Sequence, residues 1–133
     1  MSTDYELGER VRQQVMGPDY IAATQVSDKG LDGDFREHLV SSAWGGVWAR
    51  PGLDLRTRSI ITIAVLTALG RYEQLPGHIG ATKNTGVTPQ EVAEVLIHVS
   101  AYAGMPVAVS AFEIAKRVLG DPATPAESQL PAT

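Results

Sequence analysis

His78 is the side chain of this sequence most able to do chemistry, because Arg71 and Glu73 lie in the same short stretch. Histidine is the residue most easily poised for proton transfer near neutral pH. A neighbouring arginine can hold a carboxylate through two parallel hydrogen bonds. The stretch is therefore a candidate proton-transfer site for a carboxylate substrate, and a surface histidine on an exposed helix is the alternative interpretation.

His98 is the second candidate. Glu94 precedes it by four residues and Tyr102 follows it by four, so in a helix the three side chains share one edge. That arrangement could orient an acid–base residue, and a structural histidine satisfied by its neighbours is the alternative. His38 lies in a charged stretch, and we expect it to face solvent.

Other common catalytic chemistries lack a pattern in the sequence. There are no cysteines, which excludes thiolate nucleophiles, redox pairs and cysteine zinc sites. There is also no HxxxH or HExxH pair, no GxGxxG or GxxxxGK[ST] loop and no GxSxG turn. We therefore expect neither a metal nor any other cofactor.

Length and composition indicate one globular domain, because the chain has 133 residues of which 44% are apolar and 20% charged. The net charge of -4 argues against nucleic acid or an anionic membrane as a partner. The apolar run from Ile60 to Leu69 is too short to cross a bilayer, and the N-terminus does not resemble a signal peptide. We expect a cytoplasmic protein that acts on a small molecule.

Two tryptophans lie in a helix predicted over residues 34–49. Its expected core face repeats every four residues and consists of Phe35, Leu39, Ala43 and Val47. Trp44 and Trp48 are i, i+4 neighbours, and the simplest interpretation is that both belong to the core. The pair Gly45–Gly46 costs about 1 kcal/mol per glycine against alanine inside a helix. It indicates a close backbone approach, or space left for another group.

A strongly apolar helix predicted over residues 55–70 is the element around which the chain is organised. Asp54 is a plausible N-cap, and Gly70 ends the helix. Apolar residues cover nearly its whole circumference, which is typical of a helix buried inside a domain or between subunits. A chain of this length has little material to cover such a helix, so we predict a homo-oligomer.

The remaining helices are predicted over residues 3–16, 72–85, 89–103 and 106–119. Pro76–Gly77 must start or kink the second of these. Thr88, Pro89 and Glu91 form the signature of a capping box before the third. No strand alternation is present. The fold class is therefore all-α, a single-domain bundle of five to seven helices over residues 1–120, followed by a flexible tail over 121–133.

Several sequence blocks together resemble the γ-carboxymuconolactone decarboxylase family. They are Trp44-Gly-Gly-Val-Trp48, Arg50-Pro-Gly-Leu-Asp54, Arg56-Thr-Arg-Ser59, Ala-Leu-Gly-Arg71, His78, Asn84-Thr-Gly-Val87 and His98-Val-Ser-Ala-Tyr-Ala-Gly104 with Pro106. The resemblance covers roughly residues 5–119. It implies an all-α fold of the alkylhydroperoxidase/carboxymuconolactone decarboxylase type, assembled as trimers or hexamers. It also implies cofactor-independent loss of carbon dioxide from a small lactone with two carboxylates, in aromatic compound catabolism.

The same resemblance implies roles for individual residues, with His78 as proton donor and Arg50 and Arg71 as carboxylate anchors. The catalytic candidates are His78, Glu73 and His98, and the substrate-binding candidates are Trp44, Trp48, Arg50, Arg71 and Tyr102. The alkylhydroperoxidase branch places a CxxCxxxH motif where this chain has Arg71, Gln74 and His78. Redox activity is therefore excluded, whereas a pocket near His78 is supported.

Three departures from the family pattern bear on the substrate. Family decarboxylases usually carry an acidic residue at the position of Gly46 and an arginine at the position of Gly80, and Pro76–Gly77 replaces a pair that favours helix. These changes should enlarge and neutralise the pocket. The alternatives are therefore another proton-transfer reaction, such as isomerisation, cyclisation or decarboxylation of a bulkier biosynthetic intermediate, or a non-catalytic ligand-binding oligomer.

Overall fold

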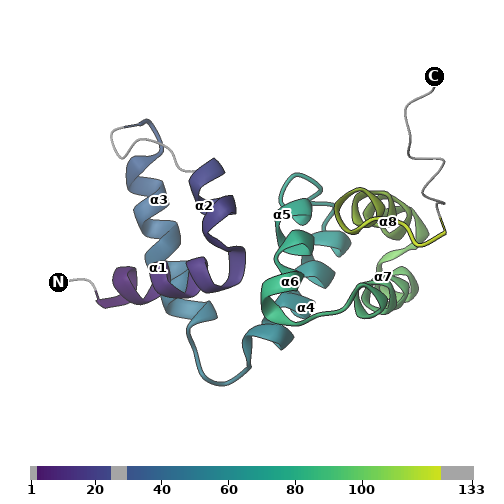
Figure 1. The fold of residues 1–133 in the computed structure, drawn as a ribbon, viewed down its shortest axis with the longest axis horizontal. Coiled ribbons are helices and arrows are strands. Elements are labelled where there is room, and N and C mark those ends of the chain that lie inside the picture. The colour runs from purple at the N-terminus through teal and green to yellow at the C-terminus, as the bar shows by residue number, and fades with distance from the viewer. Residues whose placement is uncertain (1–2, 25–29, 124–133) are drawn as a thin grey trace.

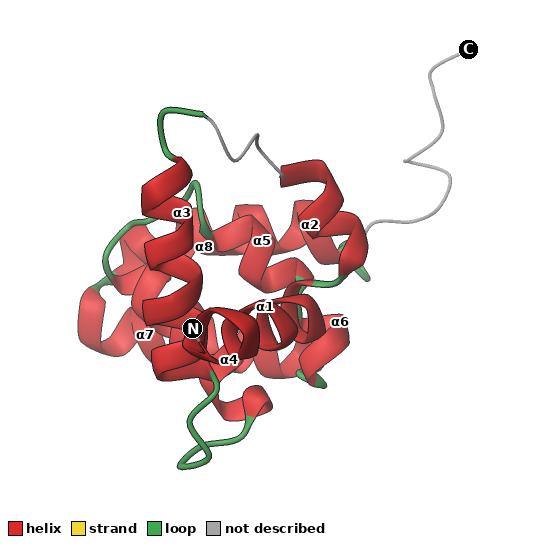
Figure 2. Ribbon diagram, turned by 90° about the vertical axis from the view of Figure 1, so that its left-hand side faces the viewer, coloured by secondary structure: helices red, strands yellow, loops and turns green. Residues whose placement is uncertain are grey.

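The computed structural model describes residues 3–24 and 30–123, which fold into helices joined by turns (Figures 1 and 2). The elements are α1 (Thr3–Met16), α2 (Pro18–Thr24), α3 (Gly33–Leu39), the π-helix η1 (Val40–Trp48), α4 (Leu55–Ala68), α5 (Leu75–Gly80), α6 (Thr82–Thr85), α7 (Pro89–Ala103) and α8 (Met105–Leu119). α3 continues directly into η1, and only Ala81 separates α5 from α6. Counted as continuous rods, the described chain has seven helices, so the all-α prediction is confirmed.

The helices form two groups, with α1, α2 and α3–η1 on one side and α4 to α8 on the other (Figure 1). The second group has its own core, which consists of Ile63, Leu75, Ile79, Val87, Val92, Leu96, Ala111, Ile114 and Ala115. A smaller core, which we call the tryptophan cluster, consists of Val15, Met16, Trp44, Trp48 and Ala81. Because Ala81 follows α5, this cluster joins the two groups. The side-chain amide of Asn84 on α6 reinforces the contact by donating to the Val15 carbonyl at 2.9 Å.

The core face predicted for residues 34–49 is wrong except at Leu39, which packs on the tryptophan cluster, whereas the prediction that Trp44 and Trp48 belong to the core is confirmed. Phe35 and Val47 are 61% and 50% exposed, and the buried side chains of η1 are instead those of Val40, Trp44 and Trp48. Local periodicity allows either stripe to face inward. The choice depends on which side of the helix can approach α1 most closely, and that side is set by two glycines.

Gly8 on α1 and Gly45 on η1 let the two backbones touch, as expected for the Gly45–Gly46 pair. A Cβ atom at Gly45 would collide with the carbonyl oxygen of Asp4, and one at Gly8 would lie 2.8 Å from the Gly45 nitrogen. Such distances leave no room for any side chain. The contact therefore turns the tryptophan face of η1 toward the inside of the molecule.

α4 begins where it was predicted, because the Asp54 side chain accepts a hydrogen bond from the Thr57 backbone N–H at 2.7 Å. It is not covered on all sides within one chain. Ile61, Val65 and Leu69 are 44%, 47% and 63% exposed, and their i, i+4, i+8 spacing places them on one stripe. The apolar surface that the sequence predicted to be buried is thus partly open.

The later helices start as their local signals predict. Thr88 and Glu91 form the complete capping box at the start of α7, and Pro76 lies in the first turn of a late-starting α5. None of the described helices combines the length and apolar character that a bilayer-crossing segment needs. Residues 124–133 of the predicted tail lie outside the described residues.

Candidate active site

His78 packs against both tryptophans, which the sequence places some thirty residues away. The centroid of its ring is 6.2 Å from that of Trp44 and 6.1 Å from that of Trp48, with interplanar angles of 12° and 16°. The two indoles stack on each other at 4.9 Å. One histidine and two tryptophans thus form a single aromatic group, in which the imidazole lies nearly parallel to both indoles.

The backbone of η1 sets the position of the indoles. Its hydrogen bonds span five residues, as between the Ala49 N–H and the Trp44 carbonyl at 3.0 Å. Such π-helical turns are rare and occur frequently at functional sites. The wider turn keeps Trp44 and Trp48 stacked on one side, where they are only 6% and 9% exposed. They leave little water around the face of His78.

The electrostatics of His78 follow from that enclosure. The ring is half-buried, and its removal from water lowers the pKa of His78 below the usual value of 6.5. Its Nδ1 atom is buried without a hydrogen-bond partner among the described residues. Buried polar atoms normally have a partner, so this nitrogen is an exception among the described residues.

α4 carries buried hydroxyls next to the element that bears His78. Ser59 and Thr67 are fully buried, and their hydroxyl oxygens have no hydrogen-bond partner within the part of the chain that the structure describes. The Thr62 hydroxyl on the same helix, by contrast, donates to the Arg58 carbonyl at 2.8 Å. The sequence carries no distinct signal for Ser59 and Thr67, because α4 carries other polar residues as well.

The charged residues predicted near His78 lie at the surface. Arg50 is exposed in the segment after η1, where its carbonyl accepts a hydrogen bond from the Arg58 guanidinium at 3.1 Å. Arg71 and Glu73 are exposed in the turns between α4 and α5. No hydrogen bond or ion pair joins any of these three to His78 among the described residues.

His98 and Tyr102 form a separate pair on α7. Their rings stack at 5.3 Å, and both side chains are exposed, Tyr102 by 85%. α7 packs chiefly against α8 and α4 rather than against η1. The structure thus brings Trp44 and Trp48 to His78 and leaves this pair outside the group. His38 is exposed, as expected, with its Nδ1 atom 3.2 Å from the Ser42 hydroxyl.

The departures from the family pattern that lie on α5 border a cavity of about 280 Å³. Pro76, Gly77 and Gly80 line it from α5, opposite Tyr20 on α2. A Cβ atom at Gly77 would lie 3.1 Å from the Tyr20 ring. The absence of a side chain at Gly77 therefore lets the Tyr20 ring pack closely against α5. Gly46 is exposed, with the nearest obstruction to a Cβ atom 3.5 Å away. The lining of this cavity does not include His78, Trp44 or Trp48, so the space that the small residues open lies beside α5 rather than at the aromatic group.

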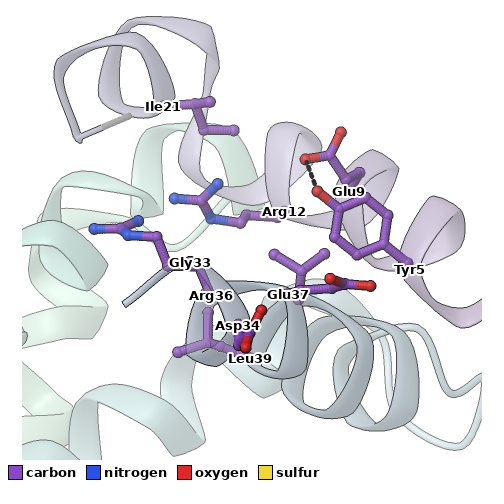
Figure 3. Close-up of a pocket in the computed structure, with 10 residues that line it drawn as sticks. Tyr5, Glu9, Arg12, Ile21, Gly33, Asp34, Arg36, Glu37 and Leu39 are labelled. Atoms are coloured by element: carbon purple, nitrogen blue, oxygen red, sulfur yellow. Dashed lines mark hydrogen bonds between the residues drawn. The ribbon is translucent and has the colours of Figure 1, made fainter. Parts of the chain in front are cut away.

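A larger cavity of about 420 Å³ lies between α1, α2 and α3 (Figure 3). Its lining residues are Tyr5, Glu9, Arg12, Ile21, Gly33, Asp34, Arg36, Glu37, Leu39 and Val40. Sequence reasoning missed Arg12 and Arg36 because they stand on different helices, with no shared spacing to reveal them. No three His, Asp or Glu side chains of the described residues are placed to hold a metal ion.

The chain is similar to known decarboxylases over most of its length. The family model described as carboxymuconolactone decarboxylase family matches residues 33–117. The 4-carboxymuconolactone decarboxylase of Acinetobacter baylyi is 41% identical over 117 residues, which cover 88% of this chain and 87% of the relative. The nitrosuccinic acid decarboxylase of Metarhizium robertsii is 29% identical over 117 residues, which cover 88% of this chain and 82% of that relative.

Proposed function

The chain belongs to the carboxymuconolactone decarboxylase family and is a carbon–carbon lyase of that family, and we propose that it removes carbon dioxide from a small carboxylated lactone of the carboxymuconolactone kind without a cofactor. The observation that carries the proposal is the half-buried His78 packed on Trp44 and Trp48. A proton donor beside a flat apolar wall suits a small conjugated ring.

The substrate class follows from what the named substrates of the two relatives share. Carboxymuconolactone and nitrosuccinic acid each have two carboxyl groups and an electron-withdrawing group. In the lactone, that group is a conjugated carbonyl. We therefore propose a dicarboxylate in which one carboxylate leaves, the other anchors the molecule, and the electron-withdrawing group accepts the electrons.

The proposed reaction balances without a redox partner. The bond between the substrate carbon and its carboxylate breaks, carbon dioxide departs, and the electron pair enters the conjugated lactone as a dienolate. His78 in its protonated form then donates a proton to carbon, which restores a neutral lactone. The histidine regains its proton from solvent before the next turnover. Arg50 and Arg71 are the anchors that the family resemblance proposes for the remaining carboxylate. Glu73 is a further catalytic candidate at the same exposed approach.

Binding of an anion should prepare His78 for this role. Burial favours the neutral imidazole, but a nearby carboxylate favours the charged form and supplies an acceptor for the orphaned Nδ1. The substrate itself would thus help to protonate its donor.

The direct experiment is to offer the purified protein carboxymuconolactone and to follow carbon dioxide release together with loss of lactone absorbance. We expect turnover with release of one carbon dioxide per lactone consumed. Absence of turnover at micromolar enzyme would contradict the proposed substrate. The second candidate is proton transfer on a bulkier lactone or polycyclic intermediate, which the small residues Gly77 and Gly80 on either side of His78 in the sequence favour. It would be supported by turnover of such a compound alone.

We also propose that the protein is a homo-oligomer, because the stripe formed by Ile61 and Val65 on α4 and by Leu69 directly after it is open in one chain. Val65→Asp should shift the assembly toward monomers, since burying an unpaired carboxylate in an apolar contact is strongly unfavourable. Sedimentation velocity at micromolar concentration measures the change. Leu31→Asp is the matched control, because Leu31 is fully exposed in a loop. A monomeric wild-type protein would contradict the proposal.

A further inference from the structure

The His98–Tyr102 pair lies outside the aromatic group and leaves a large ring in solvent. Tyr102 is 85% exposed although its ring stacks on that of His98 at 5.3 Å. The stack holds the tyrosine in one orientation, so little side-chain freedom would be lost if a partner covered it. An exposed aromatic side chain held in this way is a candidate contact for another molecule.

Tyr102 lies on the edge of α7 that runs alongside α4. Arg56, in the first turn of α4, forms an ion pair with Glu91, in the first turn of α7, and the two helices pack against each other. The helices therefore run in the same direction from neighbouring starts. His98 and Tyr102 follow Glu91 by seven and eleven residues, a spacing that returns to the same edge of a helix.

The exposed stripe that begins on α4 reaches the same end of this helix pair. Its last member, Leu69, lies thirteen residues after Arg56, and Tyr102 lies eleven residues after Glu91. Since each residue of a helix adds about 1.5 Å, the two side chains differ in height by only about 3 Å along the pair. The stripe and the aromatic pair thus form one surface, which we call the α4–α7 face and define by Ile61, Val65, Leu69, His98 and Tyr102.

The α4–α7 face comes from segments without formal charge. No Asp, Glu, Lys or Arg occurs in residues 59–70 or 95–112, although 20% of the chain is charged. The chain has a net charge of -4, so two copies repel each other where charged surfaces meet. A contact without charged residues avoids this repulsion, and interface cores are depleted in Asp, Glu and Lys and enriched in Tyr. The composition therefore suits a second copy of the same chain.

The aliphatic stripe alone is too small for a stable assembly. A standard interface buries about 800 Å² on each partner, contributed by roughly 20–30 residues. The three side chains of the stripe are 44%, 47% and 63% exposed and supply only a small part of that area. Aromatic side chains dominate interface energies, so the adjoining Tyr102 ring adds the contact that the stripe lacks.

We propose that the α4–α7 face is the surface through which one copy of the chain binds a second copy, with Tyr102 as its principal contact. The proposal rests on the homo-oligomer proposed above and names the part of the chain that forms it. It assigns the His98–Tyr102 pair to assembly rather than to proton transfer, and His98 supports the contact by orienting the tyrosine ring.

The test compares the assembly of Tyr102→Glu and Phe35→Glu by sedimentation velocity over a series of protein concentrations. Tyr102→Glu should raise the dissociation constant of the assembly about thirtyfold or more, as expected for loss of an aromatic residue buried at an interface. Phe35→Glu is the matched control, because Phe35 is 61% exposed on α3, outside the face, and it should assemble like wild type. Tyr102→Phe keeps the ring and should also assemble like wild type.

The outcomes separate this proposal from those on which it depends. An assembly that Val65→Asp dissociates and Tyr102→Glu leaves intact would overturn the role of Tyr102 alone, and equal weakening by Phe35→Glu and Tyr102→Glu would overturn it too. A monomeric wild-type protein would overturn both this proposal and the homo-oligomer. Failure of an assembled wild-type protein to convert carboxymuconolactone would overturn only the proposed substrate.

Kinetics provide a second readout for the pair. Tyr102→Glu is assayed at protein concentrations high enough to keep it assembled, so that any loss of activity by dissociation is removed. A large fall in kcat/KM under those conditions would place the ring at a substrate site and overturn its assignment to the interface. A fall that appears only when the variant dissociates would support the assignment.

Discussion

His78→Phe should lower kcat/KM by at least about a hundredfold, because a positioned general acid typically contributes that much or more. Phenylalanine keeps a flat ring against Trp44 and Trp48 and removes the ionisable nitrogens, so the change tests proton transfer rather than packing. Steady-state kinetics on the lactone measure the loss, and the melting temperature checks that the fold is retained.

The comparison with other histidines makes the result specific. His38→Phe alters an exposed side chain outside the aromatic group and should leave kcat/KM nearly unchanged. Full activity in His78→Phe would remove His78 from the mechanism. A large loss in His98→Phe with little loss in His78→Phe would transfer the donor role to α7.

The pH dependence of the same residue adds an independent readout. If protonated His78 is the donor, kcat/KM falls as pH rises through the free-enzyme pKa, which burial places below 6.5. The pH dependence of stability has the opposite sign. Because the unfolded chain binds a proton at His78 more readily than the folded chain does, the folded state loses stability as pH falls from about 6.5 through the lowered pKa. Both effects should disappear in His78→Phe.

Gly45→Ala should destabilise the protein by about 1–3 kcal/mol or more, which is the typical range for overpacking. The added methyl group would collide with the carbonyl oxygen of Asp4, which is backbone and cannot rotate away. α1 or η1 must move instead, and either movement disturbs the indoles next to Gly45. Thermal unfolding should show a melting temperature lower by roughly 4–12 °C, together with altered tryptophan fluorescence.

Gly46→Ala is the control for this substitution, since it lies one residue away in the same helix. It is exposed, and the nearest atom to an added Cβ is 3.5 Å away. Alanine is favoured over glycine in a helix by about 1 kcal/mol, so we expect neutral or increased stability. If Gly45→Ala proved as stable as Gly46→Ala, the prediction would be contradicted, because α1 and η1 could then move apart at little cost in stability.

Local chemistry was sufficient to predict where most helices begin. The capping box of Thr88 and Glu91 and the N-cap of Asp54 involve residues three positions apart, so the local sequence is enough to indicate them. The polar flanks and the apolar residues of α4 likewise identify it from sequence alone. The apolar composition of α4 could not show which of its sides another helix covers.

The aromatic group and its neighbouring cavity could not be derived in this way. Trp44 and His78 come together because Gly8 and Gly45 draw η1 onto α1, and because Ala81 packs into the same cluster. Those contacts join segments far apart in the chain, and no sequence spacing encodes them.

The amino-acid sequence thus determined the helical class, the helix starts and the resemblance that singled out His78, because each depends on short-range patterns or on recognisable blocks. Only the tertiary structure decided that Phe35 and Val47 face solvent while Trp44 and Trp48 enclose His78. It also placed Arg12 and Arg36 at one end of a shared cavity. The physical reason is that a helix presents several faces with similar local energies, and close packing against distant segments selects one of them.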